Sequence, residues 1–291
     1  MNGLSIIVPS YNEEGSIAKT IELLQVVISN FHTPSEIIVV NDGSQDETSD
    51  ILSSLQGRVK VITNERRLGY GAALKRGILN AGYDHVAIID ADGTYQPQDL
   101  GELLKASLEG KYDMVVGARK RVHIQEPVIR KLGKWFIMRL ACYLSAQDIP
   151  DLNSGLRIMN LGVVKEFLHL LPDGFSFTTT ITLAMLLNGY RVKFIPVNYS
   201  YKAGSSKVRP IRDTFGFAQL VIRTVMYFNP LKVFFPFSLL LVILAFLVLG
   251  LSSMIFGQPM DVTFGIMIMT AVLVLGIGML ADLIDKRMKI Y

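Results

Sequence analysis

The chain has 291 residues, of which 50% are hydrophobic and 19% charged, and its net charge is +4. A mean hydropathy of +0.38 is high for a soluble enzyme, so the composition argues against a purely soluble protein and directs attention to membrane segments. The single cysteine, Cys142, excludes an intrachain disulfide, and the lack of a basic run argues against nucleic acid as a partner.

Short apolar runs alternate with helical patterns over the first 120 or so residues. This alternation predicts an α/β fold in which helices cover both faces of a parallel sheet. Ligands bind such sheets at the carboxyl ends of the strands, so the loops after the strands are the expected site. The expected strands are Leu4–Val8, Glu36–Val40, Val59–Ile62, His85–Ile89 and Met114–Val116, and the expected helices are Ile17–Ile28, Asp50–Leu55, Gly71–Asn80 and Gln98–Leu108.

Polar loops follow the first two expected strands. They run from Pro9 to Glu14 and from Asn41 to Glu47. In each loop a serine, Ser10 or Ser44, stands three residues before a glutamate. This is capping-box spacing, which by itself predicts a helix start. The functional alternative is that Asp42, at a strand end, accepts hydrogen bonds from a nucleotide base or ribose.

Two aspartates, Asp90 and Asp92, follow the fourth expected strand with one residue between them. Mg²⁺ and Mn²⁺ prefer oxygen ligands and often take one or two carboxylates together with substrate phosphates. An Asp-x-Asp pair is common on surface loops. Here the pair follows an apolar run that is typical of a buried strand, and the other two loops are expected at the same edge of the sheet. The pair therefore predicts a divalent cation that neutralises a leaving diphosphate.

Two later segments have amphipathic helical patterns. Residues 128–145 place apolar residues on one side and basic residues, including Arg130, on or near the other. This segment is interpreted equally well as an interfacial helix or as a helix packed on the core. Residues 210–230 carry a similar stripe and lead directly into the first long apolar run, which predicts a juxtamembrane helix.

Two runs near the C-terminus, Val233–Phe256 and Val262–Ala281, contain no charged residue. A helix needs about 20 apolar residues to cross the hydrocarbon core of a bilayer, so both runs are long enough. The short connector predicts a hairpin of two transmembrane helices within residues 231–291. Small residues of the second run that would allow close packing are Gly265, Ala271, Gly276 and Gly278.

Basic residues lie before the first apolar run and after the second, but not between the two runs. Arg223 and Lys232 precede the first run and Lys286, Arg287 and Lys289 follow the second, whereas the connector carries only an aspartate. The positive-inside rule then predicts a multi-pass membrane protein whose N-terminal region and both termini are cytosolic. A pI near 9.0 fits an anionic membrane surface or a phosphate-bearing substrate.

Six short motifs follow one another along the chain: Pro9-x-Tyr11-Asn12-Glu13, Asn41-Asp42-Gly43-Ser44, Asp90-Ala91-Asp92, Gly117-Ala118-Arg119, Asp151-Leu152-Asn153-Ser154-Gly155-Leu156-Arg157 and Gly204-Ser205-Ser206-Lys207. In this order and spacing they resemble the family-two inverting glycosyltransferases of the GT-A fold. The last two narrow the resemblance to the dolichyl-phosphate mannose and glucose synthase branch. The resemblance covers about residues 4–209, the expected cytosolic domain, and the C-terminal hairpin.

The resemblance implies a site in three parts. A nucleotide sugar would contact Pro9, Tyr11, Glu13, Asp42 and Asp90, and Asp90 and Asp92 would hold Mg²⁺ or Mn²⁺. Asp92, Asp151 and Arg119 would lie at the reacting centre. The acceptor phosphate would be bound by Arg119, Lys207 and Arg209, and Arg130 is added because it lies on the candidate interfacial helix.

The implied activity is inverting transfer of a hexosyl group from a UDP-glucose-type or GDP-mannose-type donor to a polyprenyl phosphate, either dolichyl or undecaprenyl, at the cytosolic membrane face. The expected partners are the nucleotide sugar, the lipid phosphate and the bilayer, and self-association through the hairpin stays open. Two alternatives remain. One is a membrane glycosyltransferase with a hydroxyl acceptor, which needs a general base. The other is a non-catalytic GT-A membrane scaffold.

Some residues depart from the pattern of this branch. Thr94 stands where some mannose synthases have a glutamine metal ligand, and Thr178, Thr179 and Thr180 follow Phe177 where relatives often carry acidic residues. Both departures leave the identity of the sugar open. The only tryptophan lacks the Gln-x-x-Arg-Trp context of processive polysaccharide synthases, which argues against a polymerising enzyme.

Overall fold

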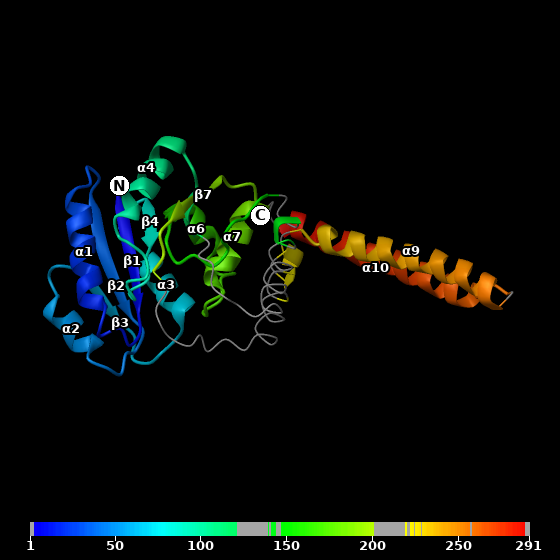
Figure 1. The fold of residues 1–291 in the computed structure, drawn as a ribbon, viewed down its shortest axis with the longest axis horizontal. Coiled ribbons are helices and arrows are strands. Elements are labelled where there is room, and N and C mark those ends of the chain that lie inside the picture. The colour runs from blue at the N-terminus through cyan, green and yellow to red at the C-terminus, as the bar shows by residue number, and fades with distance from the viewer. Residues whose placement is uncertain are drawn as a thin grey trace.

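The computed structural model describes residues 3–120, 139, 141–143, 147–200, 219, 222–223, 225–227, 229–256 and 258–288. Most of the candidate interfacial helix at 128–145 and much of the expected juxtamembrane helix at 210–230 lie outside these residues. Figure 1 shows two parts: a sheet flanked by helices, and a long pair of helices that projects away from it.

The sheet has seven strands in the order β3-β2-β1-β4-β6-β5-β7. All neighbouring pairs are parallel except those made by β6, which runs antiparallel to both β4 and β5. The predicted α/β class with a mostly parallel sheet is therefore confirmed, and β6 makes the sheet mixed. The strands are β1 (Leu4–Ser10), β2 (Ser35–Asn41), β3 (Lys60–Thr63), β4 (His85–Ile88), β5 (Met114–Arg119), β6 (Arg157–Asn160) and β7 (Val192–Val197).

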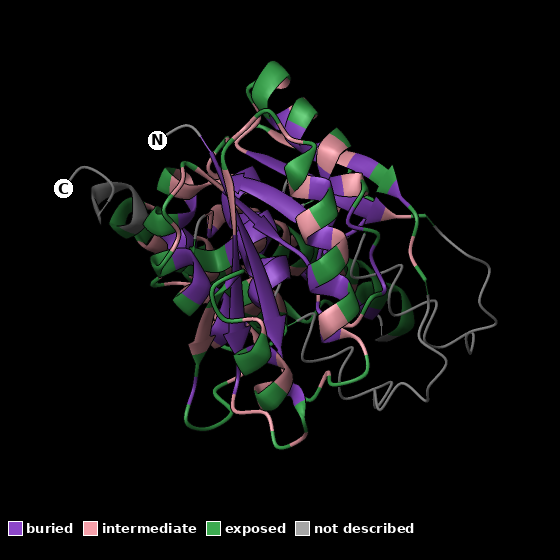
Figure 2. Ribbon diagram, turned by 90° about the vertical axis from the view of Figure 1, so that its left-hand side faces the viewer, coloured by how far each residue is buried: buried purple, intermediate pink, exposed green. Residues whose placement is uncertain are grey.

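Helices cover both faces of the sheet because successive side chains of a strand point to opposite faces. In β1, Ile6 and Val8 pack into one core with α1, α2 and α4, whereas Ile7 packs into the other core with α3, α6 and α7. Figure 2 shows buried strands in the middle and exposed residues on the outer sides of the helices. The helices are α1 (Ile17–Ser29), α2 (Thr48–Ser54), α3 (Tyr70–Leu79), α4 (Asp99–Gly110), α6 (Leu161–Phe167) and α7 (Phe177–Leu187).

The chain order reverses direction in the sheet between β1 and β4. From β1 the chain moves to β2 and β3 on one side, and β4 then returns to pair with β1 on the other. Such a switch point leaves a crevice at the carboxyl ends of the two strands, where α/β proteins bind their ligands. The loops that begin after β1 and β4 carry Tyr11 and Asp90.

The two C-terminal helices, α9 (Leu231–Phe256) and α10 (Asp261–Met288), pack against each other as the sequence predicted. Both are long and apolar enough to cross a membrane. The Ser238 hydroxyl donates to the carbonyl of Ala271 at 2.9 Å, and a Cβ added to Gly278 would lie 2.5 Å from Cβ of Phe234. Ala271 and Gly278 are thus close contacts between the helices. A Cβ added to Gly265 or Gly276 would meet no atom within 4 Å, so close packing at these two glycines is not observed.

A third apolar cluster joins the two parts of the molecule. Leu183 and Leu186 of α7 and Leu152 of the loop before β6 pack with Val225, and Val233 of α9 lies against the same cluster. The side of α7 that carries Leu183 and Leu186 is therefore covered in part by Val225 and Val233.

The capping-box interpretation is wrong for both loops. Ser10 is the last residue of β1, and α1 begins only at Ile17. Ser44 lies in the loop before α2, and the helix begins at Thr48. The Ser44 hydroxyl accepts a hydrogen bond from the backbone amide of Asn12 at 3.1 Å, so this serine joins the first loop to the second instead of capping a helix.

Candidate active site

The loops after β1 and β2 are tied together by hydrogen bonds. Besides the bond from Asn12 to Ser44, the amide of Gln45 donates to Oδ1 of Asn12 at 2.8 Å, and the amide of Glu13 donates to the hydroxyl of Thr48 at 2.9 Å. Asn12 adopts a positive φ of 54°, which asparagine tolerates better than most residues. The two loops form one surface at the carboxyl edge of the sheet.

Three residues predicted to contact the nucleotide lie on or next to this surface. Pro9 is buried within β1, while Tyr11 and Glu13 are half-buried. The guanidinium of Arg67 lies 4.2 Å above the centre of the Tyr11 ring, which is a cation–π contact. Oε2 of Glu13 accepts a hydrogen bond from the hydroxyl of Ser16 at 2.8 Å.

The carboxylate of Asp42 is only 3% exposed and holds the loop between β3 and α3. Oδ1 accepts hydrogen bonds from the side-chain amide of Asn64 at 2.8 Å and from the amide of Leu68 at 2.9 Å, and Oδ2 accepts from the amide of Gly69 at 2.8 Å. Asp42 therefore positions this loop beside Tyr11. The sequence predicted only a ligand contact here, because the partners of Asp42 lie more than 20 residues further along the chain.

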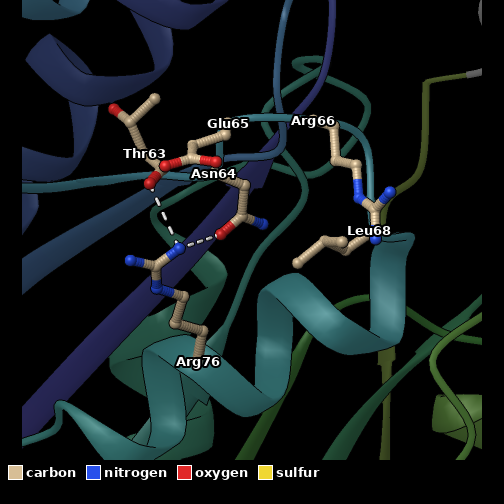
Figure 3. A pocket seen from close by; sticks show the side chains of 6 residues that line it. All are labelled: Thr63, Asn64, Glu65, Arg66, Leu68 and Arg76. Carbon is tan, nitrogen blue, oxygen red and sulfur yellow. Dashed lines mark hydrogen bonds between the residues drawn. The ribbon is translucent and has the colours of Figure 1, made fainter.

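A pocket of about 290 Å³ opens on the same loop and is lined by Thr63, Asn64, Glu65, Arg66, Leu68 and Arg76. Figure 3 shows Arg76 reaching up from α3 to the carbonyl of Thr63, 3.1 Å away, and to Oδ1 of Asn64. Because Asn64 also bonds to Asp42, the pocket wall and the Asp42 carboxylate belong to one hydrogen-bonded unit.

Asp90 lies at the end of β4 in a confined position. The hydroxyl of Tyr70 donates to Oδ1 of Asp90 at 2.8 Å, and a Cβ added to Gly155 would overlap Oδ2. Only glycine fits at position 155 without displacing the carboxylate. Burial raises the pKa of Asp90 to about 6, and the charge of Asp92 adds to this rise, although the Tyr70 hydrogen bond opposes it. Burial and the charge of Asp90 also raise the pKa of Tyr70 well above its ordinary value, so its hydroxyl keeps the proton.

Asp92 is oriented by its neighbour Thr94, which is buried. Oδ1 of Asp92 accepts hydrogen bonds from the hydroxyl of Thr94 at 2.6 Å and from its amide at 3.1 Å. Within the described part of the chain, Oδ2 of Asp92 accepts no hydrogen bond. Thr94, which replaces the glutamine of some mannose synthases, thus fixes one oxygen and leaves the other available.

The two aspartates fit a divalent cation that shares its ligands with a substrate. Among the described residues, no group of three or more His, Cys, Asp or Glu side chains is arranged to hold a metal. The donor set at this edge is two carboxylates, which are hard oxygen ligands. Mg²⁺ and Mn²⁺ commonly bind through one or two carboxylates and complete their coordination with phosphate oxygens and water.

Asp151 and Arg119 form a two-pronged ion pair. Nε of Arg119 donates to Oδ2 of Asp151 at 2.7 Å, and Nη2 donates to Oδ1 at 2.9 Å. The backbone amides of Arg119 and Asn153 donate to the same carboxylate, at 3.2 and 3.0 Å. Burial alone would raise the pKa of Asp151, but the hydrogen bonds and charge of Arg119 outweigh it and hold the pKa below its ordinary value.

Arg157 is completely buried and has no carboxylate partner among the described residues. Nε donates to the carbonyl of Ser154 at 3.2 Å, and Nη1 donates to the carbonyl of Thr178 and the hydroxyl of Thr182, both at 3.0 Å. This guanidinium therefore joins the loop that contains Asp151 to the first turns of α7. Burial lowers the pKa of Arg157.

Tyr95 and Ser154 complete the loop beside Asp90. The hydroxyl of Ser154 donates to the carbonyl of Gly117 at 2.5 Å and lies 3.2 Å from the hydroxyl of Tyr95, which accepts a bond from the amide of Gly155 at 2.9 Å. No sequence pattern predicted a role for Tyr70, Tyr95 or Arg157. The only signal was that Ser154, Gly155 and Arg157 belong to one of the six motifs.

Three predicted phosphate-binding residues, Arg130, Lys207 and Arg209, lie outside the described residues. The described residues bring together Pro9, Tyr11 and Glu13 near Asp42. They also bring Asp90 next to Gly155, in the loop that contains Asp151, and Asp151 is bound by Arg119 at the end of β5. The predicted nucleotide and reacting-centre residues thus lie along one edge of the sheet.

Comparison with known proteins identifies a family and several relatives of this chain. The family model for glycosyl transferase family 2 matches residues 5–166. Glycosyltransferase AglD of Haloferax volcanii is 28% identical over 230 residues, which cover 76% of this chain and 36% of AglD. A low-salt glycan biosynthesis hexosyltransferase of the same organism is 25% identical over 214 residues, which cover 72% of this chain and 51% of that protein. The chain thus spans about a third and about half of the length of these two relatives.

A solved structure shares the fold. Glucosyl-3-phosphoglycerate synthase from Mycobacterium tuberculosis, crystallised with Mn²⁺, UDP and phosphoglyceric acid, matches with a TM-score of 0.59 and 18% identity, covering 77% of this chain and 78% of that one. The mixed sheet with helices on both faces is therefore a GT-A fold. Since the family model matches more than half of the chain, this protein belongs to glycosyl transferase family 2.

Proposed function

We propose that this protein transfers a hexosyl group, with inversion, from a nucleotide-diphosphate sugar to a polyprenyl phosphate at the cytosolic face of a membrane. The observation that carries the proposal is the state of Asp151. Its carboxylate is held by both prongs of Arg119 and by two backbone amides, and its pKa is depressed. A carboxylate in this state is a poor proton acceptor at neutral pH. An acceptor that is already ionised, such as a phosphate, does not need one.

The donor half of the proposal rests on Asp90 and Asp92. We propose that both hold Mg²⁺ or Mn²⁺ together with the diphosphate of a UDP-glucose-type or GDP-mannose-type donor. The bound cation would supply positive charge where negative charge develops on the leaving diphosphate. The free oxygen of Asp92 and the Mn²⁺ and UDP held by the similar glucosyl-3-phosphoglycerate synthase support this assignment.

The nucleotide is proposed to lie on the joined loops after β1 and β2. Tyr11 and Arg67 offer an aromatic ring and a planar cation against which a base can stack, and Glu13 and Pro9 lie next to them. In this proposal Asp42 acts in two ways: it fixes the loop that carries Arg67, and Oδ2, for which the described residues supply one hydrogen-bond donor, would accept a second bond from the nucleotide.

The acceptor part of the proposal rests on the negative charge of a phosphate and on its reactivity as a nucleophile. A phosphate monoester has a second pKa near 6 and is largely dianionic at pH 7, so it is a nucleophile as it stands. We propose that Arg119, kept in place by Asp151, aligns this phosphate, with Arg130, Lys207 and Arg209 as further contributors. At the start of α7, where relatives often carry acidic residues, the side chains are the neutral hydroxyls of Thr178, Thr179 and Thr180. This absence of negative charge suits an anionic acceptor.

The membrane part of the proposal rests on α9 and α10. Both helices are long and apolar enough to span a bilayer, and their packed hairpin begins next to α7. We propose that residues 1–209 form a cytosolic domain, that 210–230 is a juxtamembrane helix, and that 231–291 anchors the protein with both termini in the cytosol. This arrangement brings the sheet edge close to the headgroup plane, where a lipid phosphate lies.

Substituting Asp151 by asparagine tests the choice of acceptor. If the acceptor is a phosphate, we expect Asp151→Asn to lower kcat by about tenfold or less, because the amide oxygen still accepts from Arg119. The pH–rate profile should keep its shape, with a rise through about pH 6 as the phosphate loses its second proton. A general base would instead contribute about 10²–10⁴-fold. A loss of that size, with disappearance of the acidic limb that a general base gives as it loses its proton, would favour the hydroxyl-acceptor alternative.

A further inference from the structure

Phe175 is the most exposed large apolar side chain among the described residues outside α9 and α10, at 75% exposure. It lies in the short loop between α6 and α7. Leaving a phenylalanine in water forgoes the favourable transfer of its ring to an apolar environment. Single exposed apolar residues are common, so exposure alone assigns no role. The setting of this ring is more informative.

The ring is held in its exposed position by the protein. It stacks on Tyr70 of α3, with ring centres 5.3 Å apart and planes inclined by 18°. The loop before it is fixed to the same helix, because the amide of Ala72 donates to the carbonyl of Asp173 at 3.1 Å and Nζ of Lys75 forms an ion pair with Asp173 at 2.7 Å. The exposed ring is therefore a preformed feature and needs no ordering when something binds to it.

The stack is continuous with the proposed reaction centre. Tyr70, which covers one face of Phe175, donates its hydroxyl to Oδ1 of Asp90 at 2.8 Å. The side chain of Tyr70 thus lies between Phe175 and the carboxylate of Asp90, which is proposed to bind the nucleotide sugar. Thr179, four residues further along, bonds to Asn153 of the loop that contains Asp151. An apolar ring that lies one side chain away from the proposed reaction centre is expected to contact the group attached next to the reacting atoms.

We propose that the outward face of Phe175 contacts the first isoprene unit of the lipid acceptor, next to its phosphate. This inference rests on the proposed function. The ring offers no charge and no hydrogen bond, so it suits hydrocarbon, and in a polyprenyl phosphate the first hydrocarbon group follows the phosphate directly. The donor diphosphate and its cation are instead assigned to the carboxylates of Asp90 and Asp92. The acceptor also arrives from the membrane, and α7, which begins two residues after Phe175, packs through Leu183 and Leu186 against Val225, which precedes the hairpin, and against Val233 of α9.

Kinetics of Phe175→Ala test this contact in the full-length protein in detergent. With a short polyprenyl phosphate as the varied substrate, we expect the acceptor KM to rise about tenfold, which corresponds to about 1.4 kcal/mol. The donor KM and the slow hydrolysis of the donor by water should not change. Phe175→Leu, which keeps an apolar side chain, should recover most of the loss. Leu79→Ala is the matched control, because Leu79 is 64% exposed at the opposite end of α3, and its kinetics should equal those of the wild type.

Three outcomes would overturn the contact. One is an unchanged acceptor KM in a Phe175→Ala protein that unfolds at the same temperature as the wild type. The second is an equal rise of the donor KM, which would assign the ring to the sugar. The third is an equal loss with methyl phosphate, which has no isoprenoid chain to contact the ring. Failure of the proposed function is distinguishable, because it would appear as no transfer to polyprenyl phosphate by the wild-type protein itself.

Discussion

Replacement of Asp92 by alanine is expected to abolish glycosyl transfer while the protein stays folded. One oxygen of Asp92 is held by Thr94 and the other accepts no hydrogen bond within the described residues, so this side chain is oriented and yet available. Removing a group that stabilises charge developing in a transition state costs about 10²–10³-fold in rate, and loss of a metal ligand adds to this. We therefore expect at least about a thousandfold fall in kcat at saturating Mn²⁺.

Two control variants separate the role of the Asp92 carboxylate from the role of Thr94, which orients it. Thr94→Ala keeps both carboxylates but removes the hydroxyl that orients Asp92, so a smaller loss is expected. Asp92→Asn keeps the size of the side chain and loses the charge, and it should behave like Asp92→Ala. Binding of nucleotide with Mn²⁺, measured by calorimetry, should weaken in parallel. Turnover close to that of the wild type in Asp92→Ala would rule out the proposed metal ligand.

Replacement of Arg157 by methionine is expected to cause a large loss of stability. The guanidinium is completely buried and satisfies two carbonyls, those of Ser154 and Thr178, together with the hydroxyl of Thr182. Without the guanidinium the buried carbonyl of Ser154 loses its donor, at a cost of about 1–3 kcal/mol, whereas the carbonyl of Thr178 still accepts from the hydroxyl of Thr182 at 2.8 Å. Removing a buried charge that has no carboxylate partner among the described residues offsets part of this cost. A net loss of about 2 kcal/mol is expected, which lowers the midpoint of thermal unfolding by roughly 4–8 °C.

Arg157→Lys shows whether the shape of the side chain or its charge is responsible. Lysine keeps the charge but cannot reach both carbonyls with a rigid planar fork, so an intermediate midpoint is expected. The unfolding midpoint should be compared with that of Ser29→Ala, which removes an exposed hydroxyl that donates to the carbonyl of Val26 in its own helix, α1. An unchanged midpoint in Arg157→Met would mean that the loop from Asp151 to Gly155 is held by other contacts.

The first half of the fold could be predicted from the sequence because each strand is a short apolar run followed by a polar loop. All five predicted strands and four predicted helices begin within two residues of their positions in the structure. The loops with Asp42 and Asp90 follow directly from this, because parallel strands end at one edge of the sheet. Family membership and the GT-A fold, suggested by the motifs, are confirmed.

The second half could not be predicted in the same way. Strand β6 is as short as β3 and β4, but it begins with the buried Arg157 and runs antiparallel, so its sequence does not show the apolar run that marks the earlier strands. Helix α7 begins with a run of threonines that favour strands, and burial of this helix overrides the local preference. The roles of Asp42 and Tyr70 depend on partners distant in the chain, and no local pattern reports such pairs. Ser10 and Ser44 have the spacing of a capping box, but neither stands at the start of a helix.

The measurement that tests the central claim most directly is a transfer assay with the full-length protein in detergent. Mn²⁺ and a polyprenyl phosphate would be supplied with radiolabelled UDP-glucose or GDP-mannose in separate reactions, with the matching polyprenol, which lacks the phosphate, as the control acceptor. We predict that label from one donor moves into the lipid phase only when the acceptor carries the phosphate. Transfer to the polyprenol, or transfer only to a glycan hydroxyl, would contradict the proposed acceptor.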